Sequence, residues 1–169
     1  DVTDPAKPAI VKVIESERGS AQITSAGDLL LLGAQLPFTD RGTPRPFRQP
    51  AQDIELVTLW DIKDPLNPQQ LSSFSARGWG THRNGYFGGK YAYLAAFVEG
   101  YQGQSILLTL DVSDPRHPTE VGRWWWPGQR DNDGVEQTPM AFHGAPLLNR
   151  DGTMMTLAYA PGIVNLDVH

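Results

Sequence analysis

Residues 111–118 read Asp-Val-Ser-Asp-Pro-Arg-His-Pro, and the same pattern occurs twice earlier in the chain. Residues 1–8 read Asp-Val-Thr-Asp-Pro-Ala-Lys-Pro, and residues 61–68 read Asp-Ile-Lys-Asp-Pro-Leu-Asn-Pro. A fourth copy begins at Asp167 and stops with the chain at His169. The copies recur with a period of about 50–60 residues, which is in the range of β-propeller blades.

Each copy predicts the end of one strand and a tight connection to the next. An Asp side chain accepts a hydrogen bond from the backbone two residues on, while Pro fixes φ and removes a ladder donor. Alternating apolar residues lead into the third copy at residues 106–112, and a second extended segment leaves it. No segment has convincing helical periodicity. The sequence therefore predicts an all-β fold.

Working outward from the motif divides each repeat into four strands. The predicted strands are residues 21–25, 29–35, 54–62 and 69–75 in the first repeat, 82–87, 91–97, 105–112 and 118–126 in the second, and 143–148, 154–160 and 163–168 in the third. Residues 8–15 are expected to form the last strand of a preceding repeat. Short strands separated by Gly, Asp and Pro turns at this period favour a propeller over a sandwich.

The predicted fold class is therefore an all-β β-propeller of four-stranded antiparallel blades, with about three blades present. Residues 1–19 hold the strand of a preceding blade, 20–78 the first blade, 79–127 the second and 128–169 a third that lacks its last strand. Closed propellers typically have four to eight blades. The expected partners are thus the remaining blades of the same chain or a second copy of it, and the break inside the motif favours a fragment.

The second repeat resembles a known family. Residues 88–96, GGKYAYLAA, and 106–122, ILLTLDVSDPRHPTEVG, resemble the LVIVD-repeat family, whose blades carry a Gly-x-x-Ala-Tyr-Val strand followed by a D-V-S-D-P-x-x-P turn. The resemblance covers nearly the whole chain and is weakest in the first repeat. It implies a propeller, and the family is often extracytoplasmic, so we expect a periplasmic, secreted or cell-surface location. Most members have no assigned function, so the resemblance implies no activity.

Composition excludes several partners. The 169 residues are 40% hydrophobic, enough to form a core, and carry a net charge of −5 without charge blocks. Nucleic acid and anionic membrane surfaces are therefore not expected partners. The chain has no Cys, which excludes disulfides and thiolate metal sites. It has no run of about 18 apolar residues, so no transmembrane segment is expected.

Long connections are expected on one face of the propeller. Alternating strand directions place residues 36–53, 98–104 and 127–142 on the same rim, opposite the Asp-Pro turns. Long loops on a rigid scaffold commonly bind ligands. We therefore expect a small molecule or a protein to bind on the loop-bearing face, and we expect the Asp-Pro turns to have a structural role.

His82 and His143 are the candidate metal ligands. Each begins the innermost strand of its repeat, where the first repeat has roughly Ser20 or Gln22. Neutral imidazoles at the mouth of a central channel are suited to a divalent metal such as Fe, Zn, Cu or Mn. The alternative is structural, because a histidine at the start of a strand often only donates to a neighbouring carbonyl.

Four further residues are candidates for ligand binding. Arg83 and Asn84 adjoin His82, and strand alternation predicts that only one of them points inward. Arg45 lies in a Pro- and Arg-rich loop suited to an anionic ligand, or to a solvated arm. Glu136 follows the acidic segment 131–134, which hints at Ca²⁺ without the spacing of a calcium loop.

Trp124, Trp125 and Trp126 have two interpretations. Flat indole rings form a platform for carbohydrates or aromatic ligands. The alternative, which the alternation of strand side chains favours, is packing between neighbouring blades.

Three functions remain open from the sequence. The first is a non-catalytic binding module on the loop-bearing face. The second is a metal-dependent propeller enzyme, an oxygenase, lyase or hydrolase, with His82 and His143 among its ligands. The third is a structural module. No nucleophile elbow, phosphate-binding loop or dinucleotide fingerprint is present, so no catalytic residue is assigned.

Overall fold

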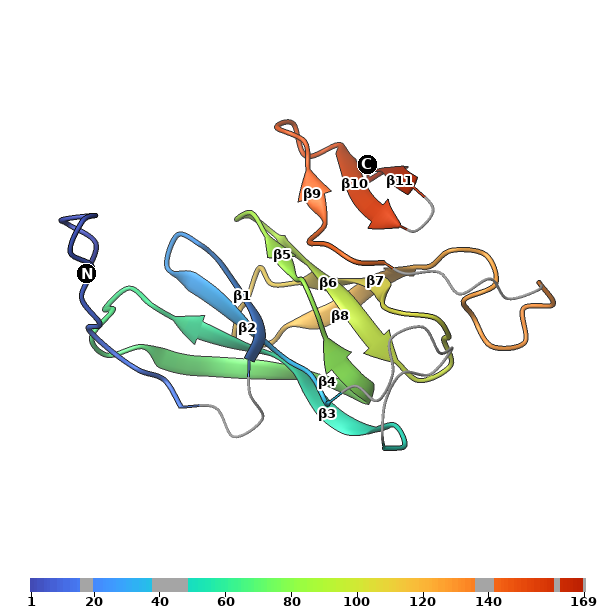
Figure 1. The fold of residues 1–169 in the computed structure, drawn as a ribbon, viewed down its shortest axis with the longest axis horizontal. Coiled ribbons are helices and arrows are strands. Elements are labelled where there is room, and N and C mark those ends of the chain that lie inside the picture. The colour runs from blue at the N-terminus through green and yellow to red at the C-terminus, as the bar shows by residue number, and fades with distance from the viewer. Residues whose placement is uncertain (16–19, 38–48, 136–141, 160–161, 169) are drawn as a thin grey trace.

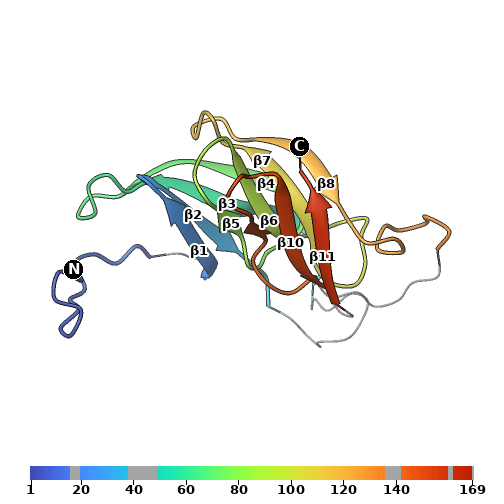
Figure 2. The same cartoon turned by 90° about the horizontal axis from the view of Figure 1, so that it is seen from above.

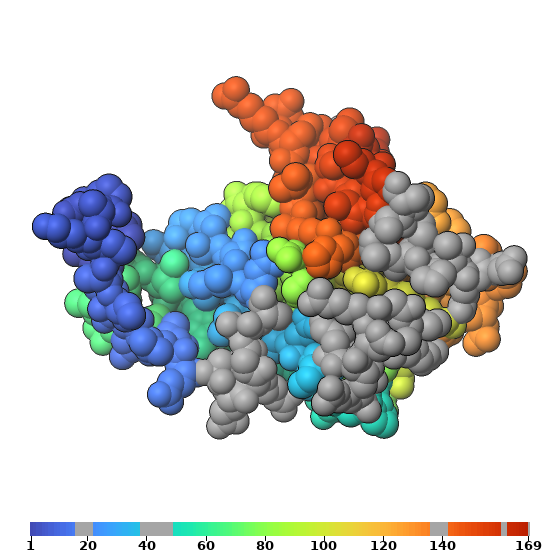
Figure 3. Space-filling model, viewed as in Figure 1, coloured from blue at the N-terminus to red at the C-terminus, as the bar shows by residue number. Residues whose placement is uncertain are grey.

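The computed structural model describes residues 1–15, 20–37, 49–135, 142–159 and 162–168 (Figure 1). These residues form eleven strands and no helix, which confirms the predicted all-β class. Within the described ranges, no helix has the length and hydrophobicity that a membrane span requires. Residues 1–15 extend away from the body of the molecule, and the third repeat projects from the body that the first two form (Figure 3).

The strands form two antiparallel sheets. The larger sheet has the order β1-β2-β3-β4-β6-β7-β8, with β5 paired to β6 beside this path. Its strands are β1 (Ser20–Ala26), β2 (Leu29–Ala34), β3 (Gln52–Asp61), β4 (Gln69–Thr81), β5 (Gly85–Tyr86), β6 (Tyr91–Val98), β7 (Ile106–Asp111) and β8 (Thr119–Trp124). The smaller sheet has the order β11-β10-β9, formed by β9 (Leu147–Leu148), β10 (Met154–Tyr159) and β11 (Gly162–Asp167). Within each sheet, most strands therefore pair with the strand that follows them in sequence.

β4 departs from the prediction because it pairs with strands of two repeats. β4 pairs with β3 from Gln69 to Gly78, and its last residues pair with β6. A register shift between Gly78 and Gly80 marks the change of partner. A side chain at either glycine would overlap neighbouring backbone, so the glycines permit a close crossing rather than ending the strand.

Residues 8–15, the predicted last strand of a preceding repeat, form no strand in the structure. Their predicted pairing partner is not part of the 169 residues, so that strand stays a prediction. The division into blades and the closure into a propeller also stay predictions.

The hydrophobic core lies between successive repeats. One cluster joins the first and second repeats and includes the fully buried Leu31, Leu94 and Leu108. A second cluster joins the second and third repeats and includes Tyr93 and Leu157. β6 is buried on both faces because its alternate side chains enter the two clusters. Figure 2 shows β10 and β11 lying across the strands of the second repeat.

The Asp-Pro turns form as the motif predicts. The first Asp of each copy accepts a 2.9 Å hydrogen bond at Oδ1 from the backbone N–H two residues later, in Asp1, Asp61 and Asp111. The second Asp does the same at 3.0 Å, in Asp4, Asp64 and Asp114. We call the end of the strands at which the turns of Asp61 and Asp111 lie the turn edge, and the turn of Asp1 lies in the N-terminal segment outside the sheet. The opposite edge, from which the long connections leave, is the loop edge.

Candidate functional site

Equivalent positions in the three repeats can be found from the pairing of the motif Asp. Asp61, Asp111 and Asp167 pair with Leu29, Tyr91 and Met154, respectively. Counting four residues along β2, β6 and β10 from these partners gives Gly33, Ala95 and Ala158. These three residues therefore occupy the same place at the loop edge.

The residues opposite them are Gln22, His82 and His143. Gln22 pairs with Gly33 in the β1–β2 ladder. The backbone N–H of His82 donates to the carbonyl of Ala95 at 2.7 Å, and that of His143 donates to the carbonyl of Ala158 at 3.0 Å. Each repeat thus places one polar side chain at the same position of its first strand. The prediction left Ser20 and Gln22 open for the first repeat, and the pairing selects Gln22.

His82 and His143 lie side by side. Their ring centroids are 5.6 Å apart, with 35° between the ring planes. His82 is half-buried and His143 is exposed, so the pair stands at a solvent-accessible position. Two imidazoles that share one divalent ion at about 2.0–2.1 Å have ring centres on the order of 5–6 Å apart. The spacing of the pair therefore fits two ligands of one metal.

A third metal ligand of the usual kind is not apparent. In the part of the chain that the structure describes, no group of three or more His, Cys, Asp or Glu side chains is placed to hold an ion. Further ligands at this position would be amide oxygens, water or groups outside the described residues. The metal assignment stays a prediction.

Asn84 is a buried polar residue beside the pair. It is 2% exposed, and its Nδ2 donates to Thr81 Oγ1 at 3.0 Å. Thr81 Oγ1 in turn donates to the carbonyl of Leu56 at 2.8 Å. Asn84 Oδ1 is buried and has no hydrogen-bond partner among the described residues. A buried acceptor without a partner is costly, so this oxygen is suited to a donor supplied by a ligand.

Gly33 makes room for this arrangement. A Cβ atom at Gly33 would lie 2.6 Å from both Asn84 Nδ2 and Thr81 Oγ1. The glycine lies opposite Gln22, whose Oε1 is likewise buried and has no partner within the described ranges. Polar groups from two repeats therefore converge on this point of the loop edge.

A backbone irregularity orients Asn84 inward. Arg83 has φ of 66°, in the left-handed region that non-glycine residues rarely adopt. His82 bonds to Ala95, whereas Gly85 pairs with Tyr93, so one extra residue is present between them. The bulge leaves Arg83 exposed and Asn84 buried. The difference in burial between the two residues thus arises from a bulge rather than from regular strand alternation, and strain of this kind is often found at functional sites.

The remaining predicted candidates are two loop residues and the acidic segment. Arg45 and Glu136 lie outside the described residues. In the acidic segment 131–134, Asp133 uses both carboxylate oxygens within its own loop, accepting from the backbone N–H of Gly128 at 2.9 Å and of Val135 at 3.0 Å. These bonds favour the solvated turn over the calcium site.

The three tryptophans pack on the two cores. Trp124 and Trp126 contact Tyr159, with ring centroids 5.6 Å and 6.0 Å away, in the cluster between the second and third repeats. Trp125 contacts Tyr101 at 5.3 Å in the other cluster. This alternation favours the packing interpretation over a ligand platform.

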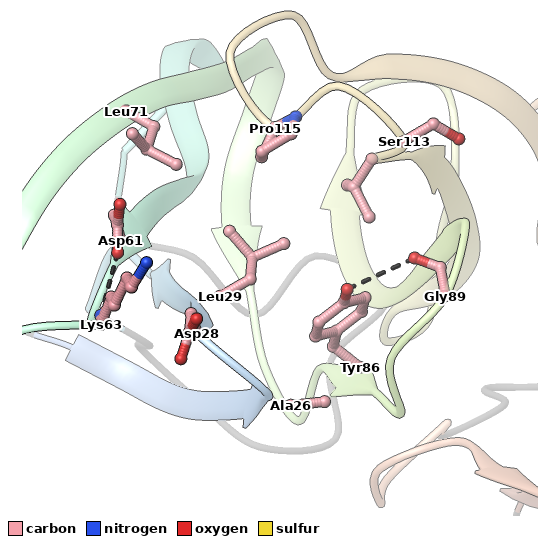
Figure 4. Close-up of a pocket in the computed structure, with 11 residues that line it drawn as sticks. Ala26, Asp28, Leu29, Asp61, Lys63, Leu71, Tyr86, Gly89, Ser113 and Pro115 are labelled. Carbon is pink, nitrogen blue, oxygen red and sulfur yellow. Dashed lines mark hydrogen bonds between the residues drawn. The ribbon is translucent and has the colours of Figure 1, made fainter.

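The turn edge contains a cavity that the sequence interpretation missed. It has a volume of about 370 Å³ and lies between the first and second repeats (Figure 4). Its lining includes Asp28, Leu29, Asp61, Lys63 and Tyr86. Asp28 was the available signal, because the equivalent residues that precede β6 and β10 are Lys90 and Thr153.

Comparisons with known proteins give no family. No family model matches the sequence, and no curated protein matches it. Functional assignment therefore depends on the repeat pattern and on the geometry described above.

Proposed function

We propose that this chain is part of an LVIVD-like, extracytoplasmic β-propeller that binds a small polar molecule at the loop edge. The observation that carries the proposal is the equivalence of Gln22, His82 and His143, one from each repeat. In a propeller, these first strands line the central channel, so the three side chains would share one ligand.

Two features support the propeller itself. Successive repeats pack face to face, with β6 buried on both sides, as the blades of a propeller do. β4 passes from the outer position of the first repeat to the inner position of the second, which is the connection expected between adjacent blades.

The chemistry of the loop edge favours a ligand that donates hydrogen bonds. Gln22 Oε1 and Asn84 Oδ1 are buried acceptors without partners among the described residues. A neutral imidazole can both donate and accept. A molecule rich in hydroxyl groups would satisfy these groups, whereas a large flat protein surface would reach the buried oxygens poorly. A small molecule therefore fits better than a protein.

A metal-dependent enzyme is the second candidate, and the spacing of the histidine pair favours it. Fe, Zn, Cu or Mn held by His82 and His143 would act as a Lewis acid, an activator of water or a redox centre. The amide oxygens of Gln22 and Asn84 would then be weak additional ligands.

The test separates the two candidates by their probes. Nuclear magnetic resonance titrations would follow the side-chain amide signals of Gln22 and Asn84 and the imidazole signals of both histidines. Glucose, inositol and glycerol serve as neutral hydroxyl-rich probes, and Zn²⁺ serves as the metal probe. We expect the polyols to shift the side-chain amide signals of Gln22 and Asn84 in the wild type. In Asn84→Leu, they should leave the Gln22 signal unshifted. Zn²⁺ binding at one equivalent, lost in His82→Ala, would instead support the enzyme.

The matched control is His117→Ala. His117 is an exposed histidine at the turn edge, where its Nδ1 contacts Asp114 Oδ2 at 2.8 Å. Its removal should leave every response at the loop edge unchanged. If neither polyols nor Zn²⁺ move the four signals, the loop edge is not the binding site and the proposal fails.

A further inference from the structure

The cavity at the turn edge is distinct from the loop-edge site. Leu29 lines the cavity, and Gly33 lies at the loop edge four residues along the same strand. At about 3.3 Å per residue, this separates the two positions by about 13 Å. A volume of about 370 Å³ is within the range of small-molecule pockets.

The lining divides into a charged and an aromatic side. In Figure 4, Asp28, Asp61 and Lys63 lie on one side of Leu29, and Tyr86 and Ser113 lie on the other. Tyr86 is 8% exposed, and its hydroxyl donates to the carbonyl of Gly89 at 3.3 Å. Burial raises the pKa of Tyr86, so its ring presents a neutral wall.

The charged side of the cavity carries a net negative charge. Asp28 and Asp61 contribute two carboxylates, and Lys63 contributes one ammonium. The ion pairs among the described residues include none of these three side chains. Lys63 is exposed, while Asp61 is half-buried and Asp61 Oδ1 accepts the backbone N–H of Lys63 at 2.9 Å. One negative charge is therefore left to attract a cation.

The second repeat shows which cation suits this position. Backbone hydrogen bonds to the residue after the motif Asp are equivalent: Ile62 N–H donates to Asp28 and Val112 N–H donates to Lys90, both at 2.8 Å. Lys90 Nζ forms an ion pair with Asp111 Oδ2 at 3.3 Å and lies 5.2 Å from the centre of the Tyr91 ring. The second repeat thus supplies its own primary ammonium where the first repeat has Asp28 and a cavity.

We propose that the cavity between the first and second repeats binds a small monocationic primary amine with an apolar body. The ammonium group lies between Asp28 and Asp61, in the place that the Lys90 ammonium takes beside Asp111. The apolar body packs on Leu29 and toward Tyr86. This site is independent of the loop-edge proposal and requires neither histidine.

The test uses hexylammonium, with hexanol and hexanoate as neutral and anionic probes of the same length. Isothermal titration calorimetry at low ionic strength would measure affinity, and the backbone amide signals of Gly89 and Ser113 would locate binding. We expect hexylammonium to bind at least about tenfold more tightly than hexanol, with no binding of hexanoate. Both amide signals should shift during the titration.

The decisive variant is Asp28→Lys, which gives the first repeat the residue of the second. It should pair with Asp61, raise the thermal midpoint slightly and reduce hexylammonium affinity at least about tenfold. Asp28→Asn, which removes the charge without adding an ammonium, should reduce affinity by a smaller factor. Asp53→Lys makes the same charge change at an exposed position on the loop-edge end of β3 and should leave affinity unchanged.

Three results would overturn the proposal. These are equal binding of hexanoate and hexylammonium, unchanged affinity in both Asp28 variants, or an equal loss of affinity in Asp53→Lys. His82→Ala should have no effect on hexylammonium binding, so failure here is distinguishable from failure at the loop edge.

Discussion

The two edges of the sheets differ in how far the repeats resemble one another. All three complete copies of the motif, two of them at the turn edge, make the same pair of hydrogen bonds from a backbone N–H to an Asp side chain. At the loop edge, equivalent positions hold Gln22, His82 and His143, and the connections differ in length. The repeats are thus alike in the turns, where the Asp hydrogen bonds span two residues. They differ at the loop edge, where equivalent side chains of several repeats would face one ligand.

This difference between the two edges indicates which positions of a repeat scaffold are available for function. The backbone hydrogen bonds that the two Asp side chains of a turn accept span only two residues, so this part of the turn requires nothing from neighbouring repeats and its sequence repeats. A position that faces other repeats is free to vary with the ligand it meets. Asp28 agrees with this view. It differs from the equivalent residues Lys90 and Thr153, and it lines the cavity that we relate to a ligand.

The largest expected effect comes from breaking the strand that links the repeats. In Gly80→Ala, the new Cβ would overlap the carbonyl oxygen of Ala34, at a residue with φ of 121°. We expect a loss of about 3–5 kcal/mol in the free energy of unfolding, because neither backbone can move without breaking its ladder. Urea denaturation would measure it.

The control for this change is Gly122→Ala in β8. A Cβ atom at Gly122 meets nothing within 4 Å, so the variant should stay within about 0.5 kcal/mol of the wild type. Equal stability of the two variants would contradict the close crossing of β4, and the two edges would then not share one rigid sheet.

A smaller effect is expected from the hydrogen-bond chain beneath the loop-edge site. Thr81→Val keeps the shape of a fully buried side chain but removes the hydroxyl that bonds to Leu56 and Asn84. Both partners are then left buried and unsatisfied, so we expect a loss of about 1–3 kcal/mol. Thermal and urea unfolding would measure it.

The matched change is Thr3→Val, in the motif turn of the N-terminal segment outside the sheet. Thr3 is exposed, and its hydroxyl bonds only to Asp1 among the described residues. We expect a change below about 0.5 kcal/mol. A larger loss in the free energy of unfolding for Thr3→Val than for Thr81→Val would contradict this contrast. Buried polar groups at the loop edge would then not depend on contacts with other repeats.

Much of the fold could be predicted because its signals are local. The Asp-Pro turns depend on hydrogen bonds two residues apart, and apolar alternation around them predicted the paired strands. The adjacency of His82 and His143 followed from the same periodicity, since equivalent positions of neighbouring repeats lie side by side. Local pattern and repeat spacing were enough for these features.

The rest depends on contacts between strands that are distant in sequence. The continuity of β4 requires Gly78 and Gly80 to pass close to other backbone, which residue type alone presents as a break. The burial of Asn84 depends on the bulge at Arg83 and on the missing side chain of Gly33. The cavity beside Asp28 depends on the packing of the first repeat against the second, which brings together residues distant in sequence.

The smallest expected effect concerns acid stability at the turn edge. The His117 side chain and the backbone N–H of Arg116 lower the pKa of Asp114 below its usual value of 3.8. A carboxylate whose pKa is lower in the folded state stabilises the protein above 3.8, and this contribution is lost as pH falls through the folded pKa. Asp114→Asn should therefore lower the thermal midpoint at neutral pH, by less than about 2 °C because the group is exposed.

The difference in thermal midpoint between wild type and Asp114→Asn should shrink as pH falls below 3.8, where the wild-type carboxyl becomes protonated. Thermal melts at closely spaced pH values would measure it, with Asp53→Asn in β3 as the control. Because the hydrogen bonds of the Asp114 carboxylate reach only Arg116 and His117, the amide signals of the other two turns should not shift. Shifts that spread from Asp114 to the turns at Asp4 or Asp64 would show that the turn edge is coupled between repeats, and the contrast between the two edges would then be lost.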